Sequence, residues 1–277
     1  MQTEKELKLA VLIDADNTSV RSLAAIMDEI TKYGVPIVKH AYGDWSKSEL
    51  AGWKETLLEV AVVPRQQYSY TSGKNATDIA MVIEAMDILH DGSADGFVLV
   101  SSDSDFTPLA LRLRESGMRV FGIGGKKTPQ PFIKACDKFI FIEILDGNDS
   151  GLVAPSAPAS NLKTETAPSP ASPQTSTPTA PQAKASSGET KEQQKGKPKP
   201  VTKADVIFLA KCIAEGAGDS PECLLSALGN LIGKKRPEFD SRNYGYSQLS
   251  KLLRSIDRFA VKGEGANISV SDTKAHL

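Results

Sequence analysis

A run of four apolar residues that leads straight into serines and aspartates constrains the fold most. Residues 97–100 read Phe-Val-Leu-Val, and residues 101–105 read Ser-Ser-Asp-Ser-Asp. A short apolar run with polar ends is typical of a strand buried in a parallel sheet. Thr107 and Pro108 then open a helix, which ends at Gly117. We therefore expect Asp103 and Asp105 at the carboxyl end of a strand, where open α/β sheets bind ligands.

Strand-like and helix-like segments alternate through the first 147 residues, which we take as one domain. Such alternation predicts a parallel sheet with helices on both faces, a three-layer α/β sandwich. The expected strands are residues 8–13, 37–42, 60–64, 97–101, 119–123 and 139–144. The expected helices are residues 19–33, 50–58, 76–89, 107–117 and 131–136, with a polar loop or edge strand at 66–73.

The composition changes after this domain. Residues 151–200 contain nine prolines and no aromatic residue. Such a segment buries too little apolar surface to offset the entropy lost on ordering. We therefore expect a disordered linker at residues 148–200.

Apolar periodicity returns in residues 201–277, which we take as a second domain. Helices are expected at residues 204–215, from Ser220-Pro221-Glu222 onward, and at 247–256. Two short alternating runs at 259–261 and 268–270 flank Gly263-Glu264-Gly265, which indicates a β-hairpin. Three helices followed by a hairpin predict a small winged helix-turn-helix.

Charge and cysteine usage narrow the class of protein. The net charge of −1 combines −6 in residues 1–150 with +3 in 151–200 and +2 in 201–277. This asymmetry suggests that residues 1–150 carry carboxylate chemistry and that the rest of the chain attracts a polyanion. The three cysteines form no disulfide or zinc pattern. The first residues lack the apolar core of a signal peptide, and no apolar run is long enough to cross a bilayer. We expect a cytoplasmic protein without a membrane partner.

Three separate segments bring acids to the predicted carboxyl edge of the sheet. Asp14 and Asp16 follow the first strand, Asp103 and Asp105 follow the fourth, and Asp78 begins a helix. Clustered carboxylates without a His/Cys set suit a hard cation, so we expect Mg²⁺ or Mn²⁺ rather than zinc. Such an ion can activate water and stabilise the charge that develops on a phosphodiester. The supporting candidates are Asn17, Lys74, Ser102 and Glu84, with Glu84 expected away from the ion or exposed.

These segments also carry a resemblance. Residues 14–17 (Asp-Ala-Asp-Asn), 74–78 (Lys-Asn-Ala-Thr-Asp) and 101–106 (Ser-Ser-Asp-Ser-Asp-Phe) resemble the signature of the NYN domain, a branch of the PIN-like nuclease superfamily. The resemblance implies a PIN-like parallel-sheet sandwich and metal-dependent ribonuclease activity. It implies that the catalytic metal cluster is Asp14, Asp78, Asp103 and Asp105, supported by Asp16 and Asn17. Ser102 stands where family members often have glycine.

The second domain resembles the LOTUS (OST-HTH) domain. The resemblance rests on Phe239, residues 244–249 (Tyr-Gly-Tyr-Ser-Gln-Leu), Leu252-Leu253, Phe259 and the final hairpin. It implies binding of single-stranded or structured RNA, or a protein-docking role. Basic side chains would contact phosphates and Tyr244 would stack on a base, unless that tyrosine is a packing residue. The candidate RNA contacts are Lys126, Lys127, Lys234, Lys235, Arg236, Arg242, Tyr244 and Lys251.

Several functions stay open at this stage. The first is a divalent-metal-dependent endoribonuclease whose C-terminal domain recruits RNA through a flexible tether. The second is a non-catalytic RNA-binding regulator with the same fold. The third is a phosphatase of the haloacid-dehalogenase type, because residues 14–18 fit its DxDxT motif. Gly122-Ile123-Gly124-Gly125 lacks the GxGxxG spacing of a dinucleotide site and is expected to be a turn. Whether the protein forms a homodimer or docks onto another protein also stays open.

Overall fold

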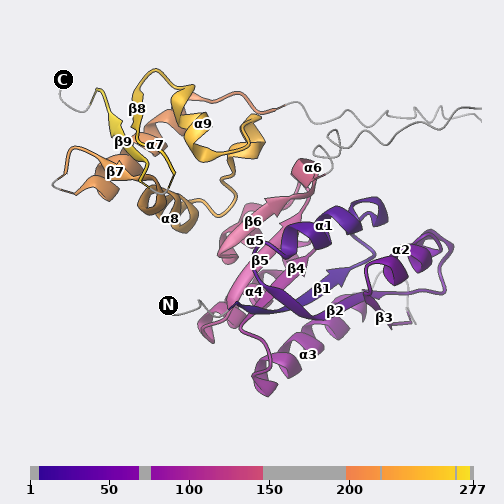
Figure 1. The fold of residues 1–277 in the computed structure, drawn as a ribbon. Helices are drawn as coiled ribbons and strands as arrows, with labels where there is room; N and C mark the ends of the chain where they lie inside the picture. The colour runs from indigo at the N-terminus through magenta and orange to yellow at the C-terminus, as the bar shows by residue number, and fades with distance from the viewer. Residues whose placement is uncertain (1–5, 69–75, 146–197, 219, 266, 275–277) are drawn as a thin grey trace, which may run out of the picture.

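Six parallel strands organise the first part of the chain in the computed structural model, which describes residues 6–68, 76–145, 198–218, 220–265 and 267–274 (Figure 1). The sheet order is β3-β2-β1-β4-β5-β6. The strands are β1 (Lys8–Asp14), β2 (Val35–Gly43), β3 (Val63–Gln66), β4 (Gly96–Val100), β5 (Arg119–Gly124) and β6 (Lys138–Phe141). The parallel sheet predicted from the alternating pattern is confirmed.

Helices cover both faces of this sheet. One face packs against α1 (Leu23–Ile30), α2 (Trp53–Glu59) and α6 (Ile142–Leu145). The other face packs against α3 (Ala76–Asp91), α4 (Thr107–Glu115) and α5 (Gln130–Ala135). Short 3-10 turns precede three of these helices: η1 (Val20–Ser22), η2 (Ser48–Leu50) and η3 (Ser104–Phe106). The three-layer architecture is therefore also confirmed.

The two central strands bring the acidic segments together. β4 is wholly buried, and β1 is buried from Leu9 onward. Ile13 of β1 is the partner of Val100 in β4. Both strands therefore end at the same level, and the polar residues that follow them share the carboxyl edge of the sheet.

The last predicted strand is shorter than expected. β6 ends at Phe141, and residues 142–145 are helical instead of extended. Phe141 pairs with Gly124, where β5 itself ends, so the following residues have no strand to pair with. Leu145 packs instead into the core beneath α1.

The turn predicted at residues 122–125 begins only at Gly125, whose carbonyl oxygen accepts the Thr128 N–H at 3.0 Å, because Gly122 and Gly124 lie within β5. Both are needed for close packing. A Cβ at Gly122 would lie 2.4 Å from a ring carbon of Phe139, and one at Gly124 would lie 2.5 Å from the carbonyl oxygen of Ser101. These glycines therefore reflect strand packing rather than phosphate binding.

The second domain combines helices with a small antiparallel sheet in the order β7-β9-β8. The predicted hairpin is confirmed, but Cys223 is not helical: it pairs with Val270, so the helix begins only at Leu225. The elements are α7 (Lys203–Ala217), β7 (Cys223–Leu224), α8 (Leu225–Lys235), η4 (Ser241–Tyr244), α9 (Leu249–Arg254), β8 (Phe259–Lys262) and β9 (Ser269–Asp272). Residues such as Leu209, Leu228, Leu253 and Val270 form a core separate from that of the first domain.

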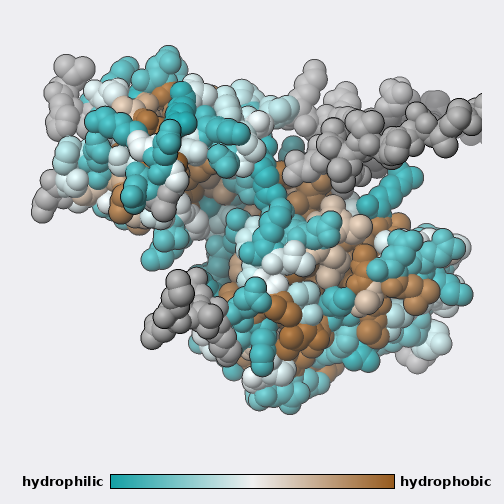
Figure 2. Space-filling view, viewed as in Figure 1, coloured by the Kyte–Doolittle hydropathy of each residue, from teal (hydrophilic) through white to brown (hydrophobic). Residues whose placement is uncertain are grey.

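The second domain lies beside β6 of the first (Figure 1). The predicted linker falls largely on residues 146–197, which lie outside the described residues. Figure 2 shows mostly hydrophilic residues on the visible face of the second domain, with more hydrophobic patches on the first. Within the described ranges, no helix has the length and apolar character needed to cross a membrane.

Candidate active site

Asp14 ends β1 and is 1% exposed. Its Oδ2 accepts hydrogen bonds from Asn17 Nδ2 and Ser101 Oγ, both at 2.8 Å. The backbone N–H of Asn17 donates to Oδ1 at 3.3 Å. Burial nevertheless raises the pKa of Asp14, and the nearby Asp16 charge adds to the rise. A buried carboxylate is thus held in one orientation by the ends of two neighbouring strands.

Asp103 and Asp105 are placed by the turn that follows β4. Ser101 Oγ accepts a hydrogen bond from the Asp103 backbone N–H at 3.0 Å. Asp103 Oδ1 in turn accepts the Asp105 backbone N–H at 2.9 Å and so caps η3. Ser101 therefore connects Asp14 to the loop that carries the other two acids.

Asp78 completes the group from the first turn of α3. Its pKa is raised to about 6 by burial, followed by the charges of Asp14, Asp103, Asp105 and Asp16. These neighbours come from two other segments of the chain. Asp78 is therefore within electrostatic reach of the acids that follow β1 and β4.

Two polar contacts around Asp16 were not predicted as parts of the site. Thr77 Oγ1 donates to Asp16 Oδ2 at 3.1 Å, and Lys47 Nζ lies 3.9 Å from Asp16 Oδ1. Thr77 precedes Asp78 and could have been included on that ground. Lys47 lies beyond the end of β2 in a polar segment without a motif, so no local pattern pointed to it. Lys74, a predicted supporting residue, lies outside the described residues.

The donor chemistry of the acids fits a hard divalent cation, because such an ion prefers carboxylate oxygens and would offset the negative charge that raises the pKa of Asp78. Among the residues that the structure describes, however, no three His, Cys, Asp or Glu side chains converge closely enough to form a metal site. Mg²⁺ keeps several waters and often uses only one or two carboxylates directly. A loose acidic set is therefore compatible with Mg²⁺.

The loop after β5 borders the acids. Ser102 Oγ accepts the Gly125 backbone N–H at 2.9 Å. The next N–H, from Lys126, donates to the Glu143 carboxylate at 2.9 Å. The side chains of Lys126 and Lys127 are exposed on this loop. Ser102 thus links the loop that carries Asp103 to the one that carries both lysines.

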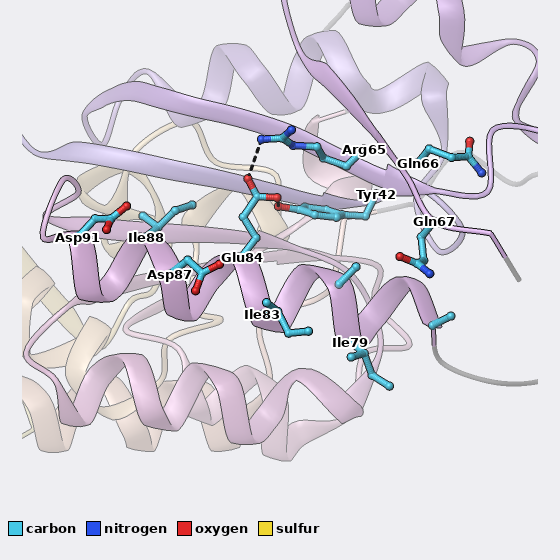
Figure 3. Close-up of a pocket in the computed structure, with 12 residues that line it drawn as sticks. Tyr42, Arg65, Gln66, Gln67, Ile79, Ile83, Glu84, Asp87, Ile88 and Asp91 are labelled. Atoms are coloured by element: carbon cyan, nitrogen blue, oxygen red, sulfur yellow. Dashed lines mark hydrogen bonds and ion pairs between the residues drawn. The ribbon is translucent and has the colours of Figure 1, made fainter.

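Glu84 lies in a different polar network. Its carboxylate accepts hydrogen bonds from Tyr42 Oη at 2.7 Å and Arg65 Nη2 at 3.0 Å, and His40 Nδ1 lies 2.6 Å away. Glu84 thus turns towards β2 and β3 and is one wall of a groove of about 860 Å³ beside α3 (Figure 3). The groove is lined by Tyr42, Arg65, Gln66, Gln67, Ala76, Ile79, Ala80, Ile83, Glu84, Asp87, Ile88 and Asp91.

The candidate RNA contacts of the second domain fall into two groups. Lys234 and Lys251 are exposed, and Lys235 is exposed but paired with Glu215. Three others are engaged within the protein: Arg236 pairs with Asp205 at 3.0 Å, Arg242 pairs with Glu29 and Asp240, and Tyr244 is 8% exposed. Tyr244 packs against the Phe239 ring, with ring centroids 5.5 Å apart. This contact agrees with the second of its two expected roles, that of a packing residue.

Comparison with known proteins identifies both domains. The family model of the NYN domain matches residues 8–143, and that of the OST-HTH/LOTUS domain matches residues 201–270. No curated protein matches. A crystal structure of a protein of unknown function from Vibrio parahaemolyticus is 21% identical and matches with a TM-score of 0.42, over 50% of this chain and 94% of that one. The chain therefore joins an NYN domain of the PIN-like nuclease superfamily to an OST-HTH/LOTUS domain.

Proposed function

We propose that this protein is a divalent-metal-dependent endoribonuclease. The observation that carries the proposal is the gathering of acids around Asp78, whose pKa rises to about 6 through burial and through four neighbouring carboxylates. Such an excess of negative charge at a sheet edge is offset most directly by Mg²⁺ or Mn²⁺. The NYN and OST-HTH/LOTUS matches support RNA as the substrate.

The proposed roles follow from where the side chains lie. Asp14, Asp78, Asp103 and Asp105 would hold the ion, which supplies an activated water and stabilises the charge of the transition state. Asn17 and Ser101 fix the Asp14 carboxylate, and Asp16 is held by Thr77. Lys126 and Lys127 are available to neutralise RNA phosphates beside the acids.

In the second domain, Lys234 and Lys251 are the candidate phosphate contacts that are exposed and form no ion pair with another described residue, whereas the exposed Lys235 pairs with Glu215. We leave Arg242 and Tyr244 out of the RNA surface, because one is ion-paired and the other is buried. This domain would raise the local concentration of RNA near the acids.

The test compares wild type with Asp103→Asn on linear and circular RNA, in Mg²⁺, Mn²⁺ and EDTA. A closed circle has no end, so its cleavage separates endonuclease from exonuclease activity. Asp87→Asn is the matched control, because Asp87 is an exposed aspartate of α3 that bonds to none of the acids above. Metal-dependent cutting of the circle, kept in Asp87→Asn and lost in Asp103→Asn, is expected. Cutting that survives in Asp103→Asn would overturn the proposal.

One observation favours a second candidate, a non-catalytic RNA-binding regulator: no three acids of the described chain converge into a metal site. RNA that is bound equally in Mg²⁺ and EDTA and stays intact would support this candidate. A phosphatase of the haloacid-dehalogenase type would instead hydrolyse a small phosphomonoester and lose that activity in Asp16→Asn.

A further inference from the structure

The two domains meet at a bidentate ion pair between residues 213 positions apart. Arg242 Nη1 donates to Glu29 Oε2 at 2.8 Å, and Arg242 Nη2 donates to Glu29 Oε1 at 2.7 Å. The Glu29 side chain is 2% exposed and that of Arg242 is 17% exposed. This is the planar fork geometry that makes arginine–carboxylate pairs strong and specific.

Each partner is held in place by its own domain. Glu29 accepts hydrogen bonds from Tyr33 Oη at 2.8 Å and Lys32 Nζ at 2.7 Å. Arg242 is held by Asp240, which accepts from Nη2 at 2.8 Å and from Nε at 3.1 Å. Both groups are therefore preorganised, which reduces the entropy lost when the domains meet.

A backbone contact accompanies the pair. The Phe139 N–H of β6 donates to the carbonyl oxygen of Pro237 at 3.0 Å. β6 is an outer strand of the sheet, so this bond engages an edge that would otherwise present unpaired backbone groups. The adjacent Lys138 has its ammonium 4.9 Å from the centre of the Tyr33 ring, which joins the β6 contact to the Glu29 contact.

The contact lies at the β6 side of the sheet. β6 is the outer strand, and its first residue, Lys138, pairs with Phe121 of β5, which in turn pairs with Val98 of β4. The acids follow other strands, since Asp103 comes after β4 and Asp14 ends β1, and β5 lies between β4 and β6. The docking contact and the candidate metal ligands are therefore carried by different strands.

We propose that Glu29, Tyr33 and the start of β6 form a docking surface for residues 237–242 of the same chain, so that the two domains act as one unit. This arrangement replaces the freely tethered domain that the sequence predicted. In this arrangement Arg242 holds the domains together instead of binding RNA. RNA bound to the second domain would then approach the nuclease domain in one fixed orientation.

A cleavable full-length chain tests the proposal. A protease recognition sequence is inserted between residues 170 and 180, the folded protein is cut, and the affinity between the two halves is measured. The wild-type halves are expected to stay associated. Glu29→Gln and Arg242→Gln should each weaken association at least tenfold, and the double variant should be little weaker than the worse single variant, since both remove one interaction.

Glu59→Gln and Arg254→Gln are the matched controls, because both side chains are exposed on other surfaces. Circular dichroism checks that each half stays folded. Amide exchange gives a second readout: the Phe139 N–H should exchange faster in Arg242→Gln, while the Ile123 N–H of β5 should not change. Wild-type halves that separate on cutting would overturn the proposal. So would a dimer by light scattering in which the second domain docks on another copy.

Discussion

Ser101 Oγ donates a 2.8 Å hydrogen bond to Asp14 Oδ2 and thereby joins the carboxyl ends of β4 and β1. The same oxygen accepts the Asp103 backbone N–H, so one hydroxyl orients two of the candidate metal ligands. We expect Ser101→Ala to lower the free energy of unfolding by about 1–3 kcal/mol, because it leaves the buried Asp14 carboxylate short of a donor. It should also raise the Mg²⁺ concentration needed for half-maximal RNA cleavage by about tenfold.

Ser116→Ala is the control for that variant, because Ser116 lies at the end of α4 and bonds to Arg112. Thermal unfolding and a Mg²⁺ titration of cleavage measure the two effects. Unchanged Mg²⁺ dependence in Ser101→Ala would show that the serine does not position the ligands.

The raised pKa of Asp78 makes metal binding pH-dependent. Because its pKa is about 6, the carboxyl is largely protonated below that pH and ionised above it. A cation binds the ionised form, so apparent Mg²⁺ affinity should fall as pH drops through about 6. Mg²⁺ titrations by calorimetry from pH 5 to pH 7.5 measure the effect. In Asp105→Asn, which removes one repelling charge, the midpoint should move to lower pH; an affinity that stays flat across the range would contradict this prediction.

The same repulsion should make the metal-free wild-type protein less stable than a variant that lacks the Asp78 charge. Asp78→Asn removes a partly buried charge that four carboxylates oppose. We expect this variant to raise the free energy of unfolding without metal by about 1 kcal/mol while abolishing cleavage, the trade-off common at active sites. The sign agrees with linkage: a carboxyl whose pKa is raised on folding costs stability as pH rises through that pKa. Urea unfolding in EDTA is the measurement, and a destabilised Asp78→Asn would refute the repulsion argument.

The sequence allowed most of the nuclease fold and its acidic edge to be predicted. Short apolar strands that end in aspartates determine both the parallel sheet and the edge where Asp14 and Asp103 meet. The helix α6 that follows β6 could not be predicted, because the point where β6 ends depends on where its partner strand β5 ends. Lys47 was missed because its proximity to Asp16 is purely tertiary. Arg242 looked like an RNA contact because nothing local shows that Glu29 lies opposite it.

Glu84 and Asp78 both lie on α3 but contact different groups, so we expect their substitutions to have different effects on RNA cleavage and on stability. The Glu84 carboxylate contacts Tyr42, Arg65 and His40 rather than the acids around Asp78. Glu84→Gln should therefore change RNA cleavage less than about threefold while lowering the free energy of unfolding by about 1 kcal/mol, the usual worth of a lost hydrogen-bonded charge. Asp78→Asn, six residues earlier on the same helix, should show the reverse pattern. Side-by-side cleavage and urea unfolding of the two variants measure this contrast, and a Glu84→Gln protein that is as inactive as Asp78→Asn would place Glu84 in the catalytic machinery.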